Sequence, residues 1–191
     1  MNKNIFFETI KCDDYEVFNL TFHEDRVAKT IAKNLNLQDY IYPPSNELSR
    51  CKVVYDESSI LSVDFFPYKK REINTFRIIE VAELEYSKKY FDRTELELLF
   101  NKRESCDEII IIKNGLVTDT SIANIAIFDG DNWITPKKPL LAGTTRARLL
   151  KNAELIEKDI TLEMLLNSKK LALMNAMIDF DEIQNYSFSY K

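Results

Sequence analysis

The sequence is poor in the residues on which many enzymes depend. Its 191 residues include one histidine, three cysteines and three glycines. A Ser-His-Asp or Cys-His site would have to use His23, and no G-x-S-x-G turn accompanies that histidine. Cys12, Cys51 and Cys106 show no C-x-x-C spacing, so a zinc site is not expected. We predict no metal centre, no catalytic triad, and reduced thiols in a cytoplasmic protein.

Several classes of partner are also excluded. Neither G-x-x-x-x-G-K-[ST] nor G-x-G-x-x-G occurs, so the common nucleotide-binding loops are absent. The net charge is −5 and no basic block is longer than Lys69–Arg71, which argues against nucleic acid as a partner. No apolar run approaches the roughly 18 residues of a membrane span, and the first twelve residues do not resemble a secretory signal. A 45% hydrophobic content favours an ordered globule.

The first half of the sequence predicts a small antiparallel sheet with one helix. Runs of aromatic and β-branched residues at 4–11 and 15–20 indicate a β-hairpin. Thr21 and Glu24 have the spacing of a capping box, and apolar residues follow with helical periodicity, so we expect a helix from about 23 to 35. Further strands are predicted at 51–55, 60–66 and 73–81.

The second half is predicted to consist mainly of strands. A capping box at Thr94–Glu97 opens a helix to about residue 102, and Gly115 and Gly130 are expected at hairpin tips. The remaining predicted elements are a helix at 145–151, a helix starting at Thr161 and a strand at 171–177. The order of elements indicates an α+β fold with largely antiparallel sheets. We expect two domains, a small one at 1–81 and a larger one at 82–191.

The third glycine, Gly143, precedes a predicted helix in the run L-L-A-G-T-T-R. The free N–H groups and the dipole at such a helix start favour a bound anion. An ordinary helix cap by Thr144 is the alternative, and both interpretations stay open on these residues alone.

Other candidate residues are equally ambiguous when taken singly. Lys88 and Lys89 end an extended run, so their side chains face opposite ways and one can point into the fold. Both could also be surface lysines. Asp119 follows a strand, where an aspartate commonly caps a turn, and Arg26 could be an exposed helical residue. Together, a lysine, a carboxylate and an anion-binding helix start are the groups that pyridoxal phosphate requires.

Longer runs of sequence resemble one family. Residues 115–146, GLVTDTSIANIAIFDGDNWITPKKPLLAGTTR, resemble the signature of the class IV aminotransferases, the fold-type IV pyridoxal-phosphate enzymes. Lys89–Arg93 resembles the family's K-x-x-[ND]-R around the cofactor lysine. Phe6–Lys11 and His23–Arg26 are similar to its F-E-T-[IM]-[RK] and H-x-x-R. The resemblance implies a small N-terminal α/β domain, a larger pseudo-barrel-like cofactor domain and a homodimer.

The resemblance also implies a role for each matched residue. Lys89 would hold the cofactor covalently and, when released by substrate, move a proton; Lys88 does not have the family spacing to Arg93. Asp119 would keep the pyridine nitrogen protonated, and Arg26 would pair with the phosphate. The implied cofactor-binding residues are Lys89, Arg26, Asp119, Gly143, Thr144, Thr145 and Asn175, and the implied substrate residues are Phe7, Thr9 and Lys11. A cation such as Lys11 could receive a substrate carboxylate.

The implied substrate is amino-acid-like, and the leading reaction is that of 4-amino-4-deoxychorismate lyase, which forms pyruvate and 4-aminobenzoate in folate biosynthesis. Thr9 in F-E-T favours the lyase-like members. The alternatives are a branched-chain or D-amino-acid aminotransferase and, from another class, a binding module whose active site has decayed. The sequence departs from the family in a shortened first half and in Asp119, where glutamate is commoner.

Overall fold

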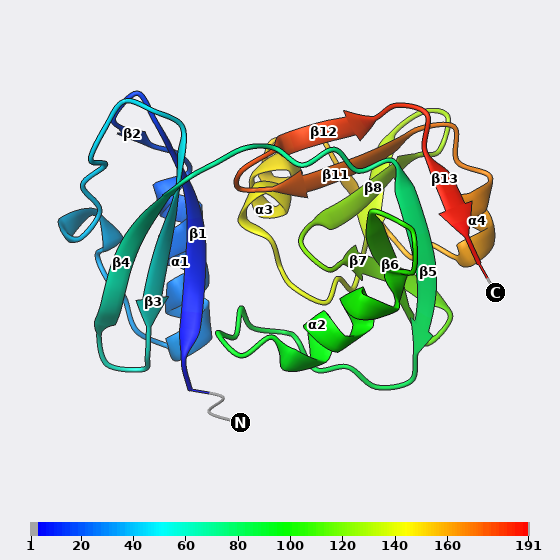
Figure 1. The fold of residues 1–191 in the computed structure, drawn as a ribbon. Helices are drawn as coiled ribbons and strands as arrows, with labels where there is room; N and C mark the ends of the chain where they lie inside the picture. The colour runs from blue at the N-terminus through cyan, green and yellow to red at the C-terminus, as the bar shows by residue number, and fades with distance from the viewer. Residues whose placement is uncertain (1–3, 191) are drawn as a thin grey trace. The chain divides into compact units, whose positions relative to one another are not determined.

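The computed structural model describes residues 4–190, which divide into two compact units. Unit 1 comprises the chain up to Lys70 together with Lys88–Asp92, and unit 2 comprises Arg71–Ser87 and the chain from Arg93 onward. Figure 1 labels most of the strands and the α-helices of both units. This boundary differs from the predicted junction after residue 81, because the strand at 75–81 pairs within unit 2.

Unit 1 is a four-stranded antiparallel sheet with one α-helix. The strand order is β2-β1-β3-β4. Its elements are β1 (Phe6–Asp13), β2 (Glu16–Val17), α1 (Leu20–Ile31), the 3-10 helix η1 (Leu37–Asp39), β3 (Ser49–Tyr55) and β4 (Ile60–Pro67). Alternate side chains of β1 and β3 enter a core shared with Val27 of α1 and Leu37 of η1. The predicted sheet and helix are therefore confirmed.

The hairpin and helix boundaries of unit 1 differ from the prediction. β2 has only two residues, and α1 begins at Leu20 with Asn19 as its N-cap, so the Thr21–Glu24 capping box does not start the helix. The Glu24 carboxylate instead accepts a hydrogen bond of 2.9 Å from the Leu37 backbone. The helix ends at Ile31 because Ala32 has a left-handed backbone, with φ of 54°.

Residues 88–92 lie beside the first part of β1. β2 pairs with only residues 12 and 13 of β1, which leaves the same edge open near its start. There the Phe7 N–H donates to the Lys89 carbonyl at 3.0 Å, and the Phe91 N–H donates to the Ile5 carbonyl at 2.9 Å. The segment that carries Lys89 is thus fixed to β1 by backbone hydrogen bonds.

Unit 2 is built around a nine-stranded mixed sheet. Its strands are β5 (Thr75–Val81), β6 (Glu108–Lys113), β7 (Leu116–Thr120), β8 (Asn124–Phe128), β9 (Trp133–Pro136), β10 (Ile156–Lys158), β11 (Leu171–Asn175), β12 (Asp179–Ile183) and β13 (Ser187–Ser189). Its helices are α2 (Thr94–Phe100), η2 (Asn101–Arg103), α3 (Thr144–Lys151) and α4 (Leu162–Leu166). The order is β10-β9-β8-β7-β6-β5-β13, and β11 joins β8 to β12.

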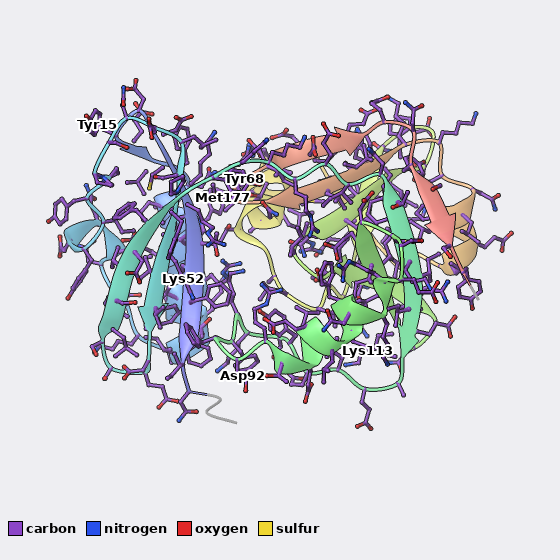
Figure 2. The ribbon with its side chains drawn as sticks, viewed as in Figure 1. Tyr15, Lys52, Tyr68, Asp92, Lys113 and Met177 are labelled. Carbon is purple, nitrogen blue, oxygen red and sulfur yellow. The ribbon has the colours of Figure 1, made fainter. Side chains whose placement is uncertain are left out.

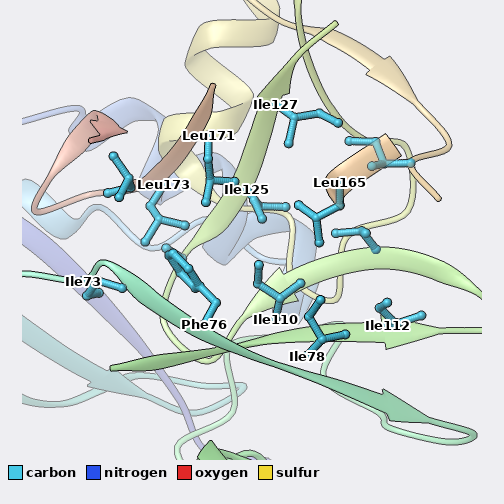
Figure 3. Close-up of a cluster of buried hydrophobic side chains, with 14 of the residues drawn as sticks. Ile73, Phe76, Ile78, Ile110, Ile112, Ile125, Ile127, Leu165, Leu171 and Leu173 are labelled. Carbon is cyan, nitrogen blue, oxygen red and sulfur yellow. The ribbon is translucent and has the colours of Figure 1, made fainter. Parts of the chain in front are cut away.

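The core of unit 2 is aliphatic. Ile110 and Ile112 of β6 pack with Phe76 of β5, Ile125 of β8 and Leu171 of β11 (Figure 3). Ile109 and Ile111, on the other face of β6, are also fully buried, and α2 contacts that strand. Burial of β6 on both faces explains why residues 109–112 are all apolar and do not alternate with polar residues.

The predicted turns of unit 2 are mostly confirmed. Gly115 and Gly130 have φ of 74° and 114°, which only glycine adopts without strain, and the Thr161 hydroxyl caps α4 by accepting from the Met164 N–H at 3.2 Å. Thr94, however, is the first helical residue of α2, and the N-cap position is held by Arg93. No helix among residues 4–190 is long and apolar enough to cross a membrane.

Candidate active site

In unit 1 a buried carboxylate holds two basic side chains of α1. Glu8 is fully buried on β1 and accepts a 2.6 Å hydrogen bond from His23 Nδ1. It also accepts from Arg26 Nε at 2.9 Å and from Arg26 Nη2. His23 and Arg26 lie three residues apart on α1, so both reach the same point of β1. The family H-x-x-R motif therefore packs on the glutamate of F-E-T.

The charges of this cluster depend on one another. Burial alone would raise the pKa of Glu8, but the Arg26 charge and the hydrogen bonds from His23 and Arg26 outweigh it and hold the pKa at about 2. Burial lowers the pKa of His23, which Glu8 opposes. Within the described chain His23 Nε2 has no hydrogen-bond partner.

Both residues of this motif face the unit 1 core. His23 is fully buried, and the Arg26 side chain is only 12% exposed, which rules out the alternative of an exposed helical arginine. Both side chains bind the buried Glu8 carboxylate. The contact of Arg26 with a phosphate stays a prediction.

Lys88 and Lys89 point to opposite faces of the unit 1 sheet. Lys88 Nζ donates to the Thr30 carbonyl of α1 at 2.8 Å. Lys89 Nζ lies 4.5 Å from the centroid of the Phe7 ring, on the other face. This confirms the expected alternation, and it assigns Lys88 to the helix side and Lys89 to the side of Phe7.

The three predicted substrate residues share that second face. Phe7, Thr9 and Lys11 are alternate residues of β1 and so point the same way. Phe7 is buried, whereas Thr9 and Lys11 are half-buried. Lys11 Nζ lies 3.9 Å from the Asp13 carboxylate and 4.7 Å from the Phe18 ring centroid.

In unit 2, Asp119 is a buried carboxylate bound to the segment before α3. Its Oδ2 accepts from the Leu141 N–H at 2.9 Å, and its Oδ1 accepts from Asn124 Nδ2 at 2.7 Å. Asn124 Nδ2 also donates to the Leu141 carbonyl at 2.8 Å. Asp119 and Asn124 face each other across β7 and β8. Burial raises the pKa of Asp119 to about 7, despite these hydrogen bonds and the Arg146 charge.

Gly143 is required by close packing and not by its backbone angles. It is the N-cap of α3 with φ of −70°, which any residue adopts. A Cβ atom at this position would lie 1.9 Å from Asn124 Oδ1. The loop can approach Asn124 only because residue 143 has no side chain. Thr144 and Thr145 follow as buried residues in the first turn of α3, so Gly143, not Thr144, occupies the cap.

A second set of hydrogen bonds holds the turn after Asp119. Arg93 Nη2 donates to the Ser121 carbonyl at 2.8 Å, and the Ser121 N–H donates to the buried Glu108 at 3.3 Å. Asn175 Nδ2 donates to the Ile122 carbonyl at 3.2 Å. Its Oδ1 accepts from two backbone N–H groups, which ends β11 at Asn175. The amide of Asn175 thus binds backbone; its contact with a cofactor stays a prediction.

Replacing Gly143 by alanine should displace the Asn124 side chain. We expect Gly143→Ala to lower the free energy of unfolding by about 1–3 kcal/mol, the usual cost of overpacking. Urea unfolding of Gly143→Ala, Asn124→Ala and the double variant measures this. Because Asn124→Ala removes the obstructing atom, adding Gly143→Ala to it should cost much less than in the wild-type protein. If the free-energy costs of the two substitutions simply add in the double variant, the close approach of residue 143 to Asn124 is contradicted.

The buried Asp119 should make the cofactor-free protein less stable as the pH rises. The folded-state pKa of Asp119, about 7, lies above the ordinary aspartate value of 3.8, so the folded state holds the proton more tightly. The contribution is present below about pH 4 and is lost as the pH rises through 7, at up to about 1.4 kcal/mol per pH unit. Urea unfolding at pH 5–8 should show this slope relative to Asp119→Asn. If the stabilities of wild type and Asp119→Asn change in parallel between pH 5 and 8, the raised pKa of Asp119 is contradicted.

No role was predicted for Glu8, Asn124 or Glu108. Glu8 interrupts the inward series Phe6, Ile10 and Cys12 of β1. A charge at an inward position needs a buried partner, so that pattern could have revealed it. Asn124 and Glu108 are the first residues of β8 and β6, where a polar residue is unremarkable, so only the folded arrangement shows their partners.

Comparisons with known proteins show which family the chain belongs to. Residues 89–185, just over half of the chain, match the family described as amino-transferase class IV. The chain is also 36% identical over 182 residues to an uncharacterized protein of Haemophilus influenzae, which covers 90% of this chain and 96% of that protein. The chain therefore belongs to the class IV aminotransferases, a family of pyridoxal-phosphate-dependent enzymes.

Solved structures give the same result. A Haemophilus somnus protein named a "putative 4-amino-4-deoxychorismate lyase" is 33% identical, with a TM-score of 0.79 over 93% of this chain and 98% of that chain. A hypothetical aminotransferase from Mycobacterium tuberculosis, in a pyridoxal-phosphate-bound form, is 14% identical with a TM-score of 0.75 over 97% and 82% of the two chains. The second likeness supports the fold alone. The predicted fold class and family are confirmed.

Proposed function

We propose that this protein binds pyridoxal 5'-phosphate and acts as a 4-amino-4-deoxychorismate lyase. The observation that carries the proposal is the 33% identity, over nearly the whole of both chains, to the Haemophilus somnus protein of that name. Thr9 in the F-E-T run supports the same choice. The product, 4-aminobenzoate, would place the enzyme in folate biosynthesis.

The residues of the two units fit the cofactor chemically. Pyridoxal phosphate needs an amine, an acid for its ring nitrogen and cationic or N–H groups for its phosphate. Lys89 would supply the amine, Asp119 the acid and Arg26 a cation, and the start of α3 at Gly143–Thr145 would add backbone N–H groups for the phosphate. When bound, the cofactor acts as an electron sink for the carbanion formed on the substrate.

In this proposal the chain's own side chains perform four tasks. Lys89 would hold the cofactor and, once the substrate amine has displaced it, would remove the proton from the substrate carbon that bears the amine. The enol form of pyruvate would then leave as the substrate ring becomes aromatic, and the proton taken by Lys89 would be returned to the departing pyruvate. Asp119 would pair with the protonated ring nitrogen, and that positive charge would lower the pKa of Asp119 from the high value caused by burial. Arg26 and the start of α3 bind the phosphate, with Arg26 oriented by Glu8.

One pair of assays separates the possible activities. The protein is incubated first with amino acid donors and 2-oxoglutarate, then with aminodeoxychorismate. Equal amounts of pyruvate and 4-aminobenzoate, without consumption of the keto acid, identify the lyase. Consumption of 2-oxoglutarate without aminobenzoate identifies an aminotransferase for branched-chain or D-amino acids and overturns the lyase assignment. Protein that takes up no pyridoxal phosphate is a binding module instead.

We also propose that the enzyme is a cytoplasmic homodimer. Its family resemblance supports the dimer, and its three free cysteines support a reducing compartment. Light scattering during gel filtration tests the first point: a mass near 45 kDa, about twice the 22.4 kDa of one chain, is expected. A single-chain mass at micromolar concentration would contradict it.

A further inference from the structure

The sheet face of unit 1 that carries Lys89 and Lys11 also carries Lys52. Lys52 of β3 lies opposite Thr9 of β1 in the antiparallel register, so both side chains stand on the face away from the α1 core. Lys89 and Phe91 reach the same face from the segment beside β1. Lys52 is labelled in Figure 2.

Lys52 lies against aromatic rings. Its Nζ is 4.4 Å from the Phe91 ring centroid and 5.6 Å from the Phe7 ring centroid. Lys89 Nζ is 4.5 Å from the same Phe7 ring, so the two ammonium groups share one aromatic neighbour. The side chain of Lys52 is half-buried. When Lys89 is joined covalently to the cofactor, Lys52 keeps its positive charge beside the Phe7 ring.

Among the described residues no carboxylate neutralises Lys52. Asp64 of β4 is directly opposite it in register, but no ion pair joins the two among residues 4–190, and the Asp64 carboxylate accepts from the Ser62 hydroxyl at 3.0 Å. Lys11, by contrast, has Asp13 at 3.9 Å. Lys52 is therefore better placed than Lys11 to receive an external carboxylate.

We propose that Lys52 binds a carboxylate of the substrate, and that the site selects planar ring compounds carrying that group. Phe7 and Phe91 meet edge to face, with centroids 6.4 Å apart, and give the apolar surface that a ring can contact. Lys52 supplies the charge-assisted hydrogen bond. This inference rests on the proposed function and names the group of the substrate that unit 1 recognises.

The test compares two ring compounds that differ by one carboxylate. Binding of 4-aminobenzoate and of aniline to cofactor-loaded protein is measured by ligand-observed NMR titration. Wild type should bind 4-aminobenzoate at least about tenfold more tightly, the effect of one hydrogen bond to a charged group. Lys52→Met and Lys52→Gln should lose this preference while their affinity for aniline is unchanged, and Lys52→Arg should retain it.

Two variants on the same sheet face serve as controls. Arg50 is two residues before Lys52 on β3 and lies over Phe66, with 5.1 Å between its guanidinium carbon and the ring centroid. Arg50→Met removes one positive charge and should leave the preference intact. Asp64→Asn removes the opposite charge and should strengthen 4-aminobenzoate binding. If Arg50→Met and Lys52→Met act equally, the effect is general charge and the proposal fails.

The remaining outcomes separate this inference from the proposed function. If the cofactor loads and Lys52→Met binds both compounds as wild type does, the lysine assignment is overturned while the enzyme assignment stands. If affinity for both compounds falls equally, Lys52 only supports packing, and the proposal is again overturned. If no cofactor loads, the proposed function fails; the same titration on the cofactor-free protein then still decides whether Lys52 recognises the carboxylate.

Discussion

Lys89→Ala is expected to abolish turnover and the absorbance of the bound cofactor. Covalent attachment needs the Nζ amine, and the same group moves the substrate proton, so activity should fall by at least about a thousandfold. The wild-type protein with pyridoxal phosphate should absorb at about 420 nm, and the variant should not retain that band after gel filtration. Turnover and absorbance are measured on the same samples.

Two matched variants show whether the loss of activity is specific to the Lys89 amine. Lys89→Arg keeps a cation beside Phe7 but cannot form the covalent link, so it should fold normally and be equally inactive. Lys88→Ala removes the neighbouring lysine, whose Nζ donates to the Thr30 carbonyl on the other face of the sheet, and should keep both colour and turnover. An active, coloured Lys89→Ala together with a colourless Lys88→Ala would reverse the assignment.

Glu8→Ala is expected to cause the largest loss of stability in unit 1. The substitution leaves His23 and the charged Arg26 buried without their shared acceptor, and removing one partner of a buried ion pair typically costs about 3–5 kcal/mol. That is a large part of the roughly 5–15 kcal/mol that stabilises a folded protein. The free energy of unfolding, from urea titration at pH 7, is the measurement.

The loss of stability caused by replacing Glu8 should be smaller when Arg26 is also replaced. Glu8→Leu with Arg26→Leu should be less destabilised than Glu8→Leu alone, because no uncompensated charge is then buried. The folded-state pKa of Glu8, about 2, lies below the ordinary glutamate value of 4.5. Its stabilisation is therefore present above about pH 4.5 and lost as the pH falls toward 2. A Glu8→Ala variant within 1 kcal/mol of wild type would contradict the account.

Much of the fold could be predicted because local patterns agree with the tertiary structure. β1 and β3 alternate apolar and polar residues, the run at 109–112 is apolar throughout, and Gly115 and Gly130 mark turns that need positive φ. Boundaries were less predictable. The Thr21–Glu24 spacing fits a capping box, yet Glu24 is used by the Leu37 backbone, a contact that no local pattern contains.

Long-range partners account for what was not predicted in unit 2. Strands β12 and β13 are short, and β13 is stabilised by pairing in parallel with β5, more than a hundred residues earlier in the chain. Gly143 could be identified as special, but the reason is its approach to Asn124, nineteen positions away. The family resemblance picked out Asp119 and Lys89 as candidates, whereas the role of Glu108 became visible only through the Ser121 N–H that donates to it.

Borohydride reduction of the cofactor-loaded protein, followed by peptide mass spectrometry, tests the central claim most directly. Reduction fixes pyridoxal phosphate to the lysine that holds it. The account predicts a pyridoxyl mass on the peptide at Lys89, in wild type and in Lys88→Ala, with loading weakened in Asp119→Asn and Arg26→Gln. Label on Lys88 or Lys52, or no label at saturating cofactor, would contradict it.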